Sequence, residues 1–239
     1  MLRSHISLLP LFLLFSLFGC STAAIQSRDA SVSTLVHPAN LIQAVREHNL
    51  GAVRVFIAQG AHVNTTDKSG MSPLMYAIRT GDKSMVQILL DNGAYVRTYT
   101  HAGLTPLMIA AARGRTEIAE MLIASGAGVN ARTAEGDTAL IFAAIYGHTD
   151  TAKVLLTHGA DADAREANGI TALMMAADAG NLGLVQALLD KGADVDITTT
   201  GDESAVVLAA DKGYASIVKL LKAAGAHEPP DYQSRQELG

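Results

Sequence analysis

The residues that could do chemistry by themselves are few in this chain of 239 residues. The single cysteine, Cys20, could serve as a nucleophile, a metal ligand or a lipid attachment point, and a lone cysteine excludes an intrachain disulfide. The eight histidines are scattered, and even His148 and His158 are well separated in the chain, whereas zinc ligands come at short, set spacings. The sequence therefore favours surface or structural histidines and predicts no metal site and no cofactor.

Acidic residues form the most regular polar pattern. The pair Asp161 and Asp163 recurs further along the chain as Asp194 and Asp196, with the same separation for both members. Asp side chains commonly accept hydrogen bonds from nearby backbone amides in turns, and the pattern is not that of an EF-hand calcium loop. The sequence contains neither the G-x-S-x-G motif of serine hydrolases nor the H-E-x-x-H motif of zinc peptidases. The phosphate-binding motif G-x-x-x-x-G-K-[ST] is absent from it too. We predict that the protein is not an enzyme and has no catalytic residues.

Charge and composition narrow the class of partner. The chain carries 18 basic and 23 acidic residues, a formal net charge of −5, whereas nucleic acid requires a basic surface. Aromatic residues make up 5% of the chain and tryptophan is absent from the sequence, so platforms for stacking bases are scarce. The hydrophobic fraction of 49% is typical of a globular protein. We expect no nucleic-acid partner.

The N-terminal segment 1–19 has the pattern of an export signal. Arg3 is followed by an apolar run from Ile6 to Phe18, shorter than the roughly 20 residues that a membrane-spanning helix needs. Residues 17–20, Leu-Phe-Gly-Cys, resemble the lipobox of bacterial lipoproteins. That resemblance implies that residues 1–19 are a lipoprotein-type signal peptide and that Cys20 is the site of lipidation.

The same resemblance has implications for localisation. Ser21 stands where inner-membrane lipoproteins of Gram-negative bacteria usually carry Asp, which implies an outer-membrane anchor facing the periplasm. The alternative is an ordinary signal cut near Ala24, which would leave a soluble periplasmic protein. Residues 20–36 are small and polar, and we expect them to form a flexible, lipid-anchored tether. Contact with the membrane would be through the lipid only.

Through the rest of the chain, glycines recur at a constant interval, which is the number of residues from Gly60 to Gly93. It appears in three glycine series, of which one belongs to a Gly-Ala pair and the other two lie between those pairs. The first series is Gly60, Gly93, Gly126, Gly159, Gly192 and Gly225; the second is Gly81, Gly114, Gly147, Gly180 and Gly213; the third is Gly70, Gly103, Gly136 and Gly169. Phase-locked series of this kind predict a repeat protein rather than a single globular core.

Each repeat contains the signals for two short helices. Ser72, Thr105, Thr138 and Thr171 stand before a Pro-Leu or Ala-Leu pair and can cap the first helix, and alanine-rich segments follow that allow close packing. Glycine ends this helix, and apolar residues at helical spacing form the second. The unit resembles the ankyrin repeat, most clearly over residues 103–132. The histidine usual in that motif is replaced by an apolar residue, for which we predict packing in place of a hydrogen bond; the positions are Met75, Met108, Ile141, Met174 and Val207.

The resemblance implies an all-α ankyrin-repeat solenoid of helix-turn-helix units joined by short β-hairpin-like turns. Residues 37–228 would hold about six repeats, and the polar residues 229–239 would form a C-terminal tail. The two end repeats are atypical, as the capping repeats of a solenoid are. Asn49 stands in the loop where the first repeat lacks glycine. In the last repeat, Gly201-Asp202 stands where other repeats have a different residue followed by glycine. The predicted repeats are residues 37–66, 67–99, 100–132, 133–165, 166–198 and 199–228.

In the ankyrin family, hairpin tips and inner helices hold a protein partner, and the matching positions here form a candidate binding stripe. Aromatic and arginine side chains, which are enriched in interface hot spots, recur along it, together with apolar residues at positions normally exposed. The candidates are Met71, Arg79, Tyr99, His101, Leu104, Arg113, Arg132, Tyr146, Arg165, Ile170 and Asp178. The alternative is that the apolar members of the stripe pack on neighbouring repeats.

Charge is uneven along this stripe. Residues 97–132 carry four basic and two acidic residues, whereas residues 161–203 carry two basic and nine acidic residues. We therefore predict a non-enzymatic, monomeric, exported module that binds a protein of unknown identity. The resemblance to exported ankyrin proteins leaves open an immunity protein against a toxin or lipase effector, an accessory factor of a periplasmic antioxidant enzyme, and a structural envelope lipoprotein.

Overall fold

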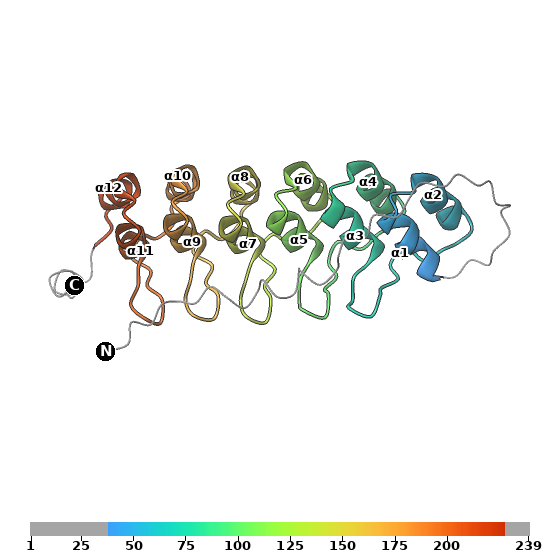
Figure 1. Cartoon of the computed structure of the whole chain (residues 1–239), viewed down its shortest axis with the longest axis horizontal. Helices are drawn as coiled ribbons and strands as arrows, with labels where there is room; N and C mark the ends of the chain where they lie inside the picture. Colours follow the sequence, from blue (N-terminus) through green and yellow to red (C-terminus); the bar gives the residue numbers. More distant parts are fainter. Residues whose placement is uncertain (1–37, 228–239) are drawn as a thin grey trace, which may run out of the picture. The chain divides into compact units, whose positions relative to one another are not determined.

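The computed structural model describes residues 38–227, which form a row of helical hairpins (Figure 1). An inner and an outer helix alternate along the chain, and the loop from each outer helix leads to the next inner one. The inner helices are α1 (Pro38–Arg46), α3 (Pro73–Thr80), α5 (Pro106–Ala112), α7 (Ala139–Ile145), α9 (Ala172–Asp178) and α11 (Ala205–Asp211). The outer helices are α2 (Leu50–Ala58), α4 (Lys83–Asp91), α6 (Thr116–Ala124), α8 (Thr149–Thr157), α10 (Leu182–Asp190) and α12 (Ala215–Ala223).

The predicted all-α solenoid is confirmed. Over the described residues the structure has helices and no named strand, with one isolated β-bridge between Thr198 and Ser204. Each predicted repeat contains one pair of helices. The predicted signal peptide (1–19), tether (20–36) and tail (229–239) lie outside the described residues. None of the described helices combines the length and the apolar character needed to cross a bilayer.

The inner helices begin at the predicted caps. The side chains of four Ser and Thr residues each accept a hydrogen bond from the backbone N–H at the third position of the helix, at 3.2–3.3 Å, and proline occupies the first helical position of α3 and α5. These caps are Ser72, Thr105, Thr138 and Thr171. The last repeat differs, because the buried Ser204 hydroxyl has no hydrogen-bond partner among the described residues.

Alanine and apolar side chains bring the inner helices together in one continuous core. The paired alanines 110–111, 143–144 and 176–177 are fully buried, so neighbouring inner helices approach closely. The positions that replace the usual histidine are buried too, which confirms the predicted packing: Met75, Met108, Ile141, Met174 and Val207. At α5 the Met108 sulfur also accepts a hydrogen bond from the Thr105 N–H, at 3.3 Å.

In each end repeat, a residue other than glycine takes the left-handed conformation at a position that is glycine in other repeats: in the mid-loop of the first repeat and in the hairpin turn of the last. His48, rather than Asn49, takes the left-handed conformation with φ of 56°, while Asn49 caps α2 by accepting the Ala52 N–H at 2.9 Å. In the last repeat Asp202 rather than Gly201 has a positive φ, of 59°. The period alone identifies both, because each lies one period from a glycine of its series. A non-glycine residue in this region costs about 1 kcal/mol.

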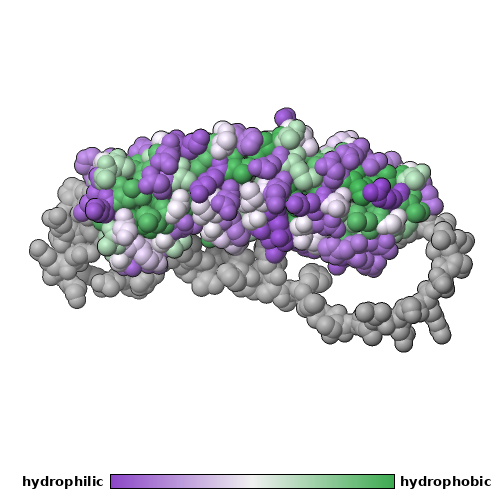
Figure 2. All heavy atoms as spheres, turned by 90° about the horizontal axis from the view of Figure 1, so that it is seen from above, coloured by the Kyte–Doolittle hydropathy of each residue, from purple (hydrophilic) through white to green (hydrophobic). Residues whose placement is uncertain are grey.

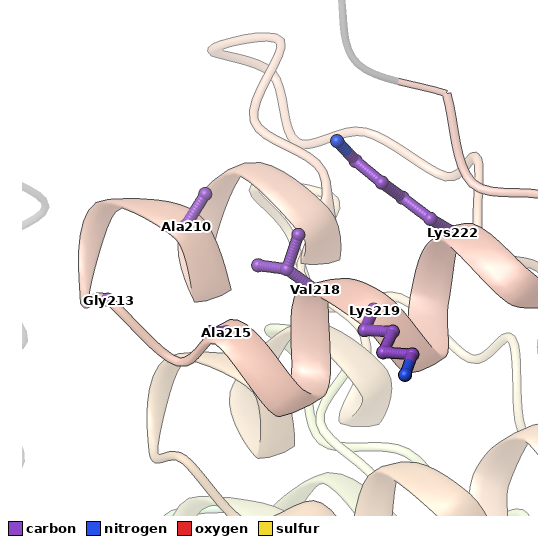
Figure 3. Close-up of a pocket in the computed structure, with 6 residues that line it drawn as sticks. All are labelled: Ala210, Gly213, Ala215, Val218, Lys219 and Lys222. Carbon is purple, nitrogen blue, oxygen red and sulfur yellow. The ribbon is translucent and has the colours of Figure 1, made fainter.

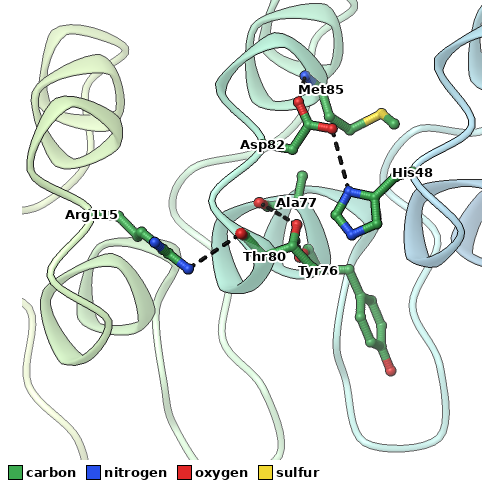
Figure 4. Close-up of polar contacts among 7 residues, drawn as sticks. All are labelled: His48, Tyr76, Ala77, Thr80, Asp82, Met85 and Arg115. Atoms are coloured by element: carbon green, nitrogen blue, oxygen red, sulfur yellow. Dashed lines mark hydrogen bonds and ion pairs between the residues drawn. The ribbon is translucent and has the colours of Figure 1, made fainter. Parts of the chain in front are cut away.

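Side chains also tie successive mid-loops together (Figure 4). His48 Nδ1 lies 3.5 Å from the Asp82 carboxylate of the next repeat, and Asp82 in turn accepts the Met85 N–H to cap α4. Arg115 donates from Nη2 to the Thr80 carbonyl of the preceding repeat, at 3.2 Å. The predicted turn-capping by aspartate is confirmed on the other connecting loops, where Asp161 accepts the Asp163 N–H at 3.1 Å and Asp163 accepts the Asp194 N–H at 2.8 Å.

One contact between mid-loops makes two glycines unequal. Gly147 and Gly180 both have φ of +71°, but a Cβ added at Gly180 would lie 2.6 Å from the Tyr214 ring, whereas nothing lies within 4 Å at Gly147. Gly147→Ala should therefore cost only the left-handed conformation, about 1 kcal/mol of unfolding free energy. Gly180→Ala should cost about 2–3 kcal/mol, because the ring must also move. Urea unfolding of both variants measures the difference, and equal losses would show that Tyr214 swings away freely.

Candidate binding surface

The loops between repeats are β-hairpin-like turns closed by their own hydrogen bonds. In the first, the Asp67 N–H donates to the Met71 carbonyl at 3.1 Å, and Asp67 Oδ1 accepts the N–H groups of Ser69 and Met71 at 2.8 and 3.0 Å. In every later turn a side-chain oxygen at the matching position accepts the corresponding N–H group. Those positions are Thr100, Thr133, Glu166 and Thr199. The tips are therefore pre-organised by local bonds rather than left as loose loops.

Neighbouring hairpins are also bonded to one another, with one exception. His101 N–H donates to the Ser69 carbonyl at 2.9 Å, Ala167 N–H to the Glu135 carbonyl at 2.7 Å, and Thr200 N–H to the Asn168 carbonyl at 2.9 Å. No such bond joins the hairpins of residues 100–104 and 133–137 in the described chain. A Cβ added at Gly103 would lie 3.8 Å from Thr133, whereas one added at Gly70 would lie 2.9 Å from the next hairpin. The described hairpins are thus least tied to one another between the second and the third.

Most polar and aromatic candidates of the predicted stripe are exposed. Tyr99, on the loop entering a hairpin, is 56% exposed, and Tyr146, directly after α7, is 40% exposed. The Tyr146 ring stacks on His148 of its own repeat, with centroids 6.4 Å apart. The exposed arginines and histidine of the stripe are His101, Arg113, Arg132 and Arg165.

The apolar candidates are less exposed than most of the polar ones. Met71, Leu104 and Ile170 are only partly exposed, and all three pack against the hydrophobic core, as the alternative interpretation held. They attach the hairpins to the inner helices. Asp137 occupies the matching position of the third hairpin, and its pKa is raised by burial and by the nearby Glu166 and Glu135 carboxylates, against a hydrogen bond from Thr133. A comparison of the repeats in the sequence would have shown that Asp137 stands where the neighbouring hairpins have Leu104 and Ile170.

Arg79 and Asp178, the candidates on inner helices, are both engaged within the structure. The Arg79 guanidinium lies over the Tyr76 ring, 4.6 Å from its centroid, and Arg46 lies 5.6 Å from the same centroid. Asp178 lies 3.4 Å from Lys212 of the next repeat. Sequence reasoning missed Arg46 and Tyr76, although Arg46 precedes Arg79 by one period.

The comparison with known families shows what this array is. A family model that describes three consecutive ankyrin repeats matches this chain over four overlapping ranges, residues 25–100, 41–133, 81–166 and 140–231. Together these ranges cover most of the chain. This chain belongs to the ankyrin-repeat family. No curated protein matches it in a sequence search. Ankyrin repeats are protein-interaction scaffolds, so the hairpin tips and inner-helix ends of this array are its candidate partner-binding surface.

The rest of the ankyrin array offers less to a partner or a substrate. Its outer-helix face shows hydrophilic and hydrophobic residues interspersed (Figure 2), with single exposed side chains such as Val55 and Leu182. A hollow at the last repeat, between α11 and α12, has a small, largely aliphatic lining with two lysines (Figure 3). In the described part of the chain, no three His, Cys, Asp or Glu residues gather as metal ligands would.

Asp67 and Tyr76 connect the first hairpin to α3 in this ankyrin array. The Tyr76 hydroxyl donates to Asp67 Oδ2 at 2.5 Å. Burial by itself would raise the pKa of Asp67, but the hydrogen bonds from Ser69, Tyr76 and Met71 outweigh it and lower the pKa to about 2. Because the folded-state pKa lies below the ordinary 3.8, this carboxylate contributes stability above pH 3.8 and loses it as the pH falls toward about 2.

Tyr76→Phe should cost about 1–2 kcal/mol of unfolding free energy at neutral pH, because a hydrogen bond to a charged group is lost. The pKa of Asp67 should rise toward 3.8 in the variant, so the difference from the original protein should shrink near pH 2. Denaturant unfolding at the two pH values measures this. Tyr95→Phe is the matched control, since Tyr95 is 63% exposed and its loss of a hydroxyl should change nothing. A pH-independent difference would contradict the role of Asp67.

Proposed function

We propose that this ankyrin protein binds another protein across its hairpin tips and inner-helix ends, and does so while exported and anchored through a lipid on Cys20. The observation that carries the first part is the centre of the stripe, where Tyr99, Arg113 and Tyr146 are exposed on pre-organised elements. Tyrosine and arginine contribute large contact area and directed hydrogen bonds at interfaces. Among the described residues, the hairpins 100–104 and 133–137 next to Tyr99 are the neighbouring pair that no backbone hydrogen bond joins.

The second part rests on the sequence of residues 17–20 and on the position of the only cysteine in the chain. An acylated Cys20 facing the periplasm would hold the ankyrin array close to the outer membrane, with residues 20–36 as the tether. The partner would then be a periplasmic or envelope protein. A role in immunity against a delivered toxin and a role beside an antioxidant enzyme both fit this placement.

Affinity capture with the full chain tests the binding function. The expected result is one protein recovered in stoichiometric amount from the periplasmic fraction of the source cells, and released by excess untagged chain. The identity of that protein, an effector toxin or a resident enzyme, distinguishes the two roles. Recovery of no stoichiometric partner under low-salt conditions would contradict the proposal and favour a purely structural envelope protein.

A further inference from the structure

An arginine stands at the end of each of the first three inner helices. Arg46 is the last residue of α1, Arg79 lies in the last turn of α3, and Arg113 directly follows α5. The guanidinium groups of Arg46 and Arg79 lie 5.6 and 4.6 Å from the centroid of one aromatic ring, that of Tyr76. Tyr76 itself is 7% exposed and is held by its hydrogen bond to Asp67. The ring is therefore a rigid platform that positions two positive charges.

No carboxylate of residues 38–227 neutralises these two charges directly. Among the described residues, no Asp or Glu oxygen lies within ion-pair distance of Arg46 or Arg79. Asp67 acts on Arg79 electrostatically, but its oxygens already accept hydrogen bonds from Ser69, Met71 and Tyr76. The donors of both guanidinium groups thus remain available to an anion from outside the chain.

The surroundings favour the arrival of such an anion. Burial lowers the pKa of Arg79, and the nearby charges of Arg113 and Arg46 lower it further, against Tyr76 and Asp67. Like charges held together raise the free energy of the unbound protein, and a bound carboxylate relieves that repulsion. A partly buried guanidinium also makes stronger charge-assisted hydrogen bonds than one in open water.

The charge at the C-terminal ends of the inner helices distinguishes the first repeats from the last ones. In the repeats that follow, the position of Arg46 is occupied next by Arg79, then by small or apolar residues, and finally by acidic ones. The full series is Arg46, Arg79, Ala112, Ile145, Asp178 and Asp211. Lys212 pairs with Asp178 at the acidic end, which offsets part of the charge there. An acidic segment is therefore attracted to the first repeats and disfavoured at the last.

We propose that Arg46 and Arg79, held over the Tyr76 ring, form a binding site for the carboxylates of an acidic segment of the partner protein. This inference rests on the proposed function and adds to it the chemistry and the direction of the partner. The planar guanidinium fork matches a carboxylate in two parallel hydrogen bonds. The partner segment lies with its acidic part at α1 and α3 and its apolar part at Ile145 and Tyr146, which are 38% and 40% exposed.

The test is fluorescence anisotropy of the full chain with two labelled peptides, one of alternating Glu and Ser and one of alternating Lys and Ser. The Glu peptide should bind in low salt and the Lys peptide should bind at least about tenfold more weakly. Arg46→Gln with Arg79→Gln should weaken the Glu peptide about tenfold. The matched control is Arg54→Gln with Lys219→Gln, which removes the same charge from exposed positions on outer helices and should change binding little.

The site is overturned if the Glu peptide does not bind, if the two peptides bind equally, or if the control variant loses as much binding as the arginine variant. If the arginine variant loses thermal stability but binds as before, the arginines serve the helix C-termini only. The protein recovered by affinity capture separates this inference from the proposed function. Undiminished binding of that protein by the Arg46→Gln, Arg79→Gln variant would refute the arginine site and leave the binding function standing. Capture of no protein, with the Glu peptide bound through the arginines, would refute the function and leave the site standing.

Discussion

Cys20→Ser should move the protein from the membrane fraction to the soluble fraction. The serine hydroxyl cannot take the thioether-linked lipid that the lipobox resemblance implies, and each buried CH₂ group of an acyl chain contributes about 0.8 kcal/mol to membrane binding. Loss of all chains removes the whole of that free energy, so the shift should be nearly complete. Fractionation followed by immunoblotting measures it, and mass spectrometry of the N-terminal peptide identifies the lipid.

Ser21→Ala is the control for this substitution. It changes the neighbouring residue and keeps the thiol, so the protein should stay with the membrane. If the Cys20→Ser protein remains in the membrane fraction with an unmodified N-terminus in both forms, the lipoprotein assignment is wrong. Cleavage near Ala24 with a soluble product in the original chain would support an ordinary signal peptide instead.

Tyr146→Ala combined with Arg113→Ala should weaken binding of the captured partner by about 3 kcal/mol, roughly a hundredfold in Kd. Both side chains are exposed at the centre of the stripe, Tyr146 directly after α7 and Arg113 directly after α5. Neither belongs to the hydrophobic core, so the helical circular dichroism signal should be unchanged. Isothermal calorimetry with the purified partner measures the loss.

The matched control removes the same two residue types from another part of the surface. Tyr95, which is 63% exposed, follows α4, and Arg54 is exposed on α2. Tyr95→Ala with Arg54→Ala should bind the partner as the original chain does. Equal affinity of both double variants would place the binding surface elsewhere, and loss of the helical signal in the Tyr146, Arg113 variant would show that those residues support the fold.

Much of the fold could be predicted from the sequence because its determinants are local and recur with a constant period. A cap such as Thr105 bonds the nearby Met108 amide, and a glycine such as Gly81 ends its own helix with φ of 83°. Both signals act within one turn of chain, so spacing is enough to find them. The close packing predicted for the alanine-rich segments is found too, with Ala110, Ala143 and Ala176 buried.

The prediction was weaker where a residue's role depends on its neighbours in space. Met71, Leu104 and Ile170 are hairpin residues whose exposure the sequence could not decide, since it depends on how far each hairpin folds back on the core. The left-handed conformation of His48 and Asp202 was not predicted either, because neither residue is a glycine. At His48 the turn is accompanied by a contact with Asp82 of the next repeat, and at Asp202 by the N–H bond to the Thr199 carbonyl of its own hairpin.

The sequence by itself determined the repeat, the helix pairs and their caps, because a solenoid contacts only adjacent units and each unit carries its own signals. It also supplied the lipobox assignment, which stays a prediction. Only the tertiary structure decided that Arg46 and Arg79, from successive repeats, share the ring of Tyr76, and that Asp67 is already engaged by hydrogen bonds. Those contacts join side chains across two repeats, and their geometry depends on the distance and rotation between stacked helices, which no spacing in the sequence encodes.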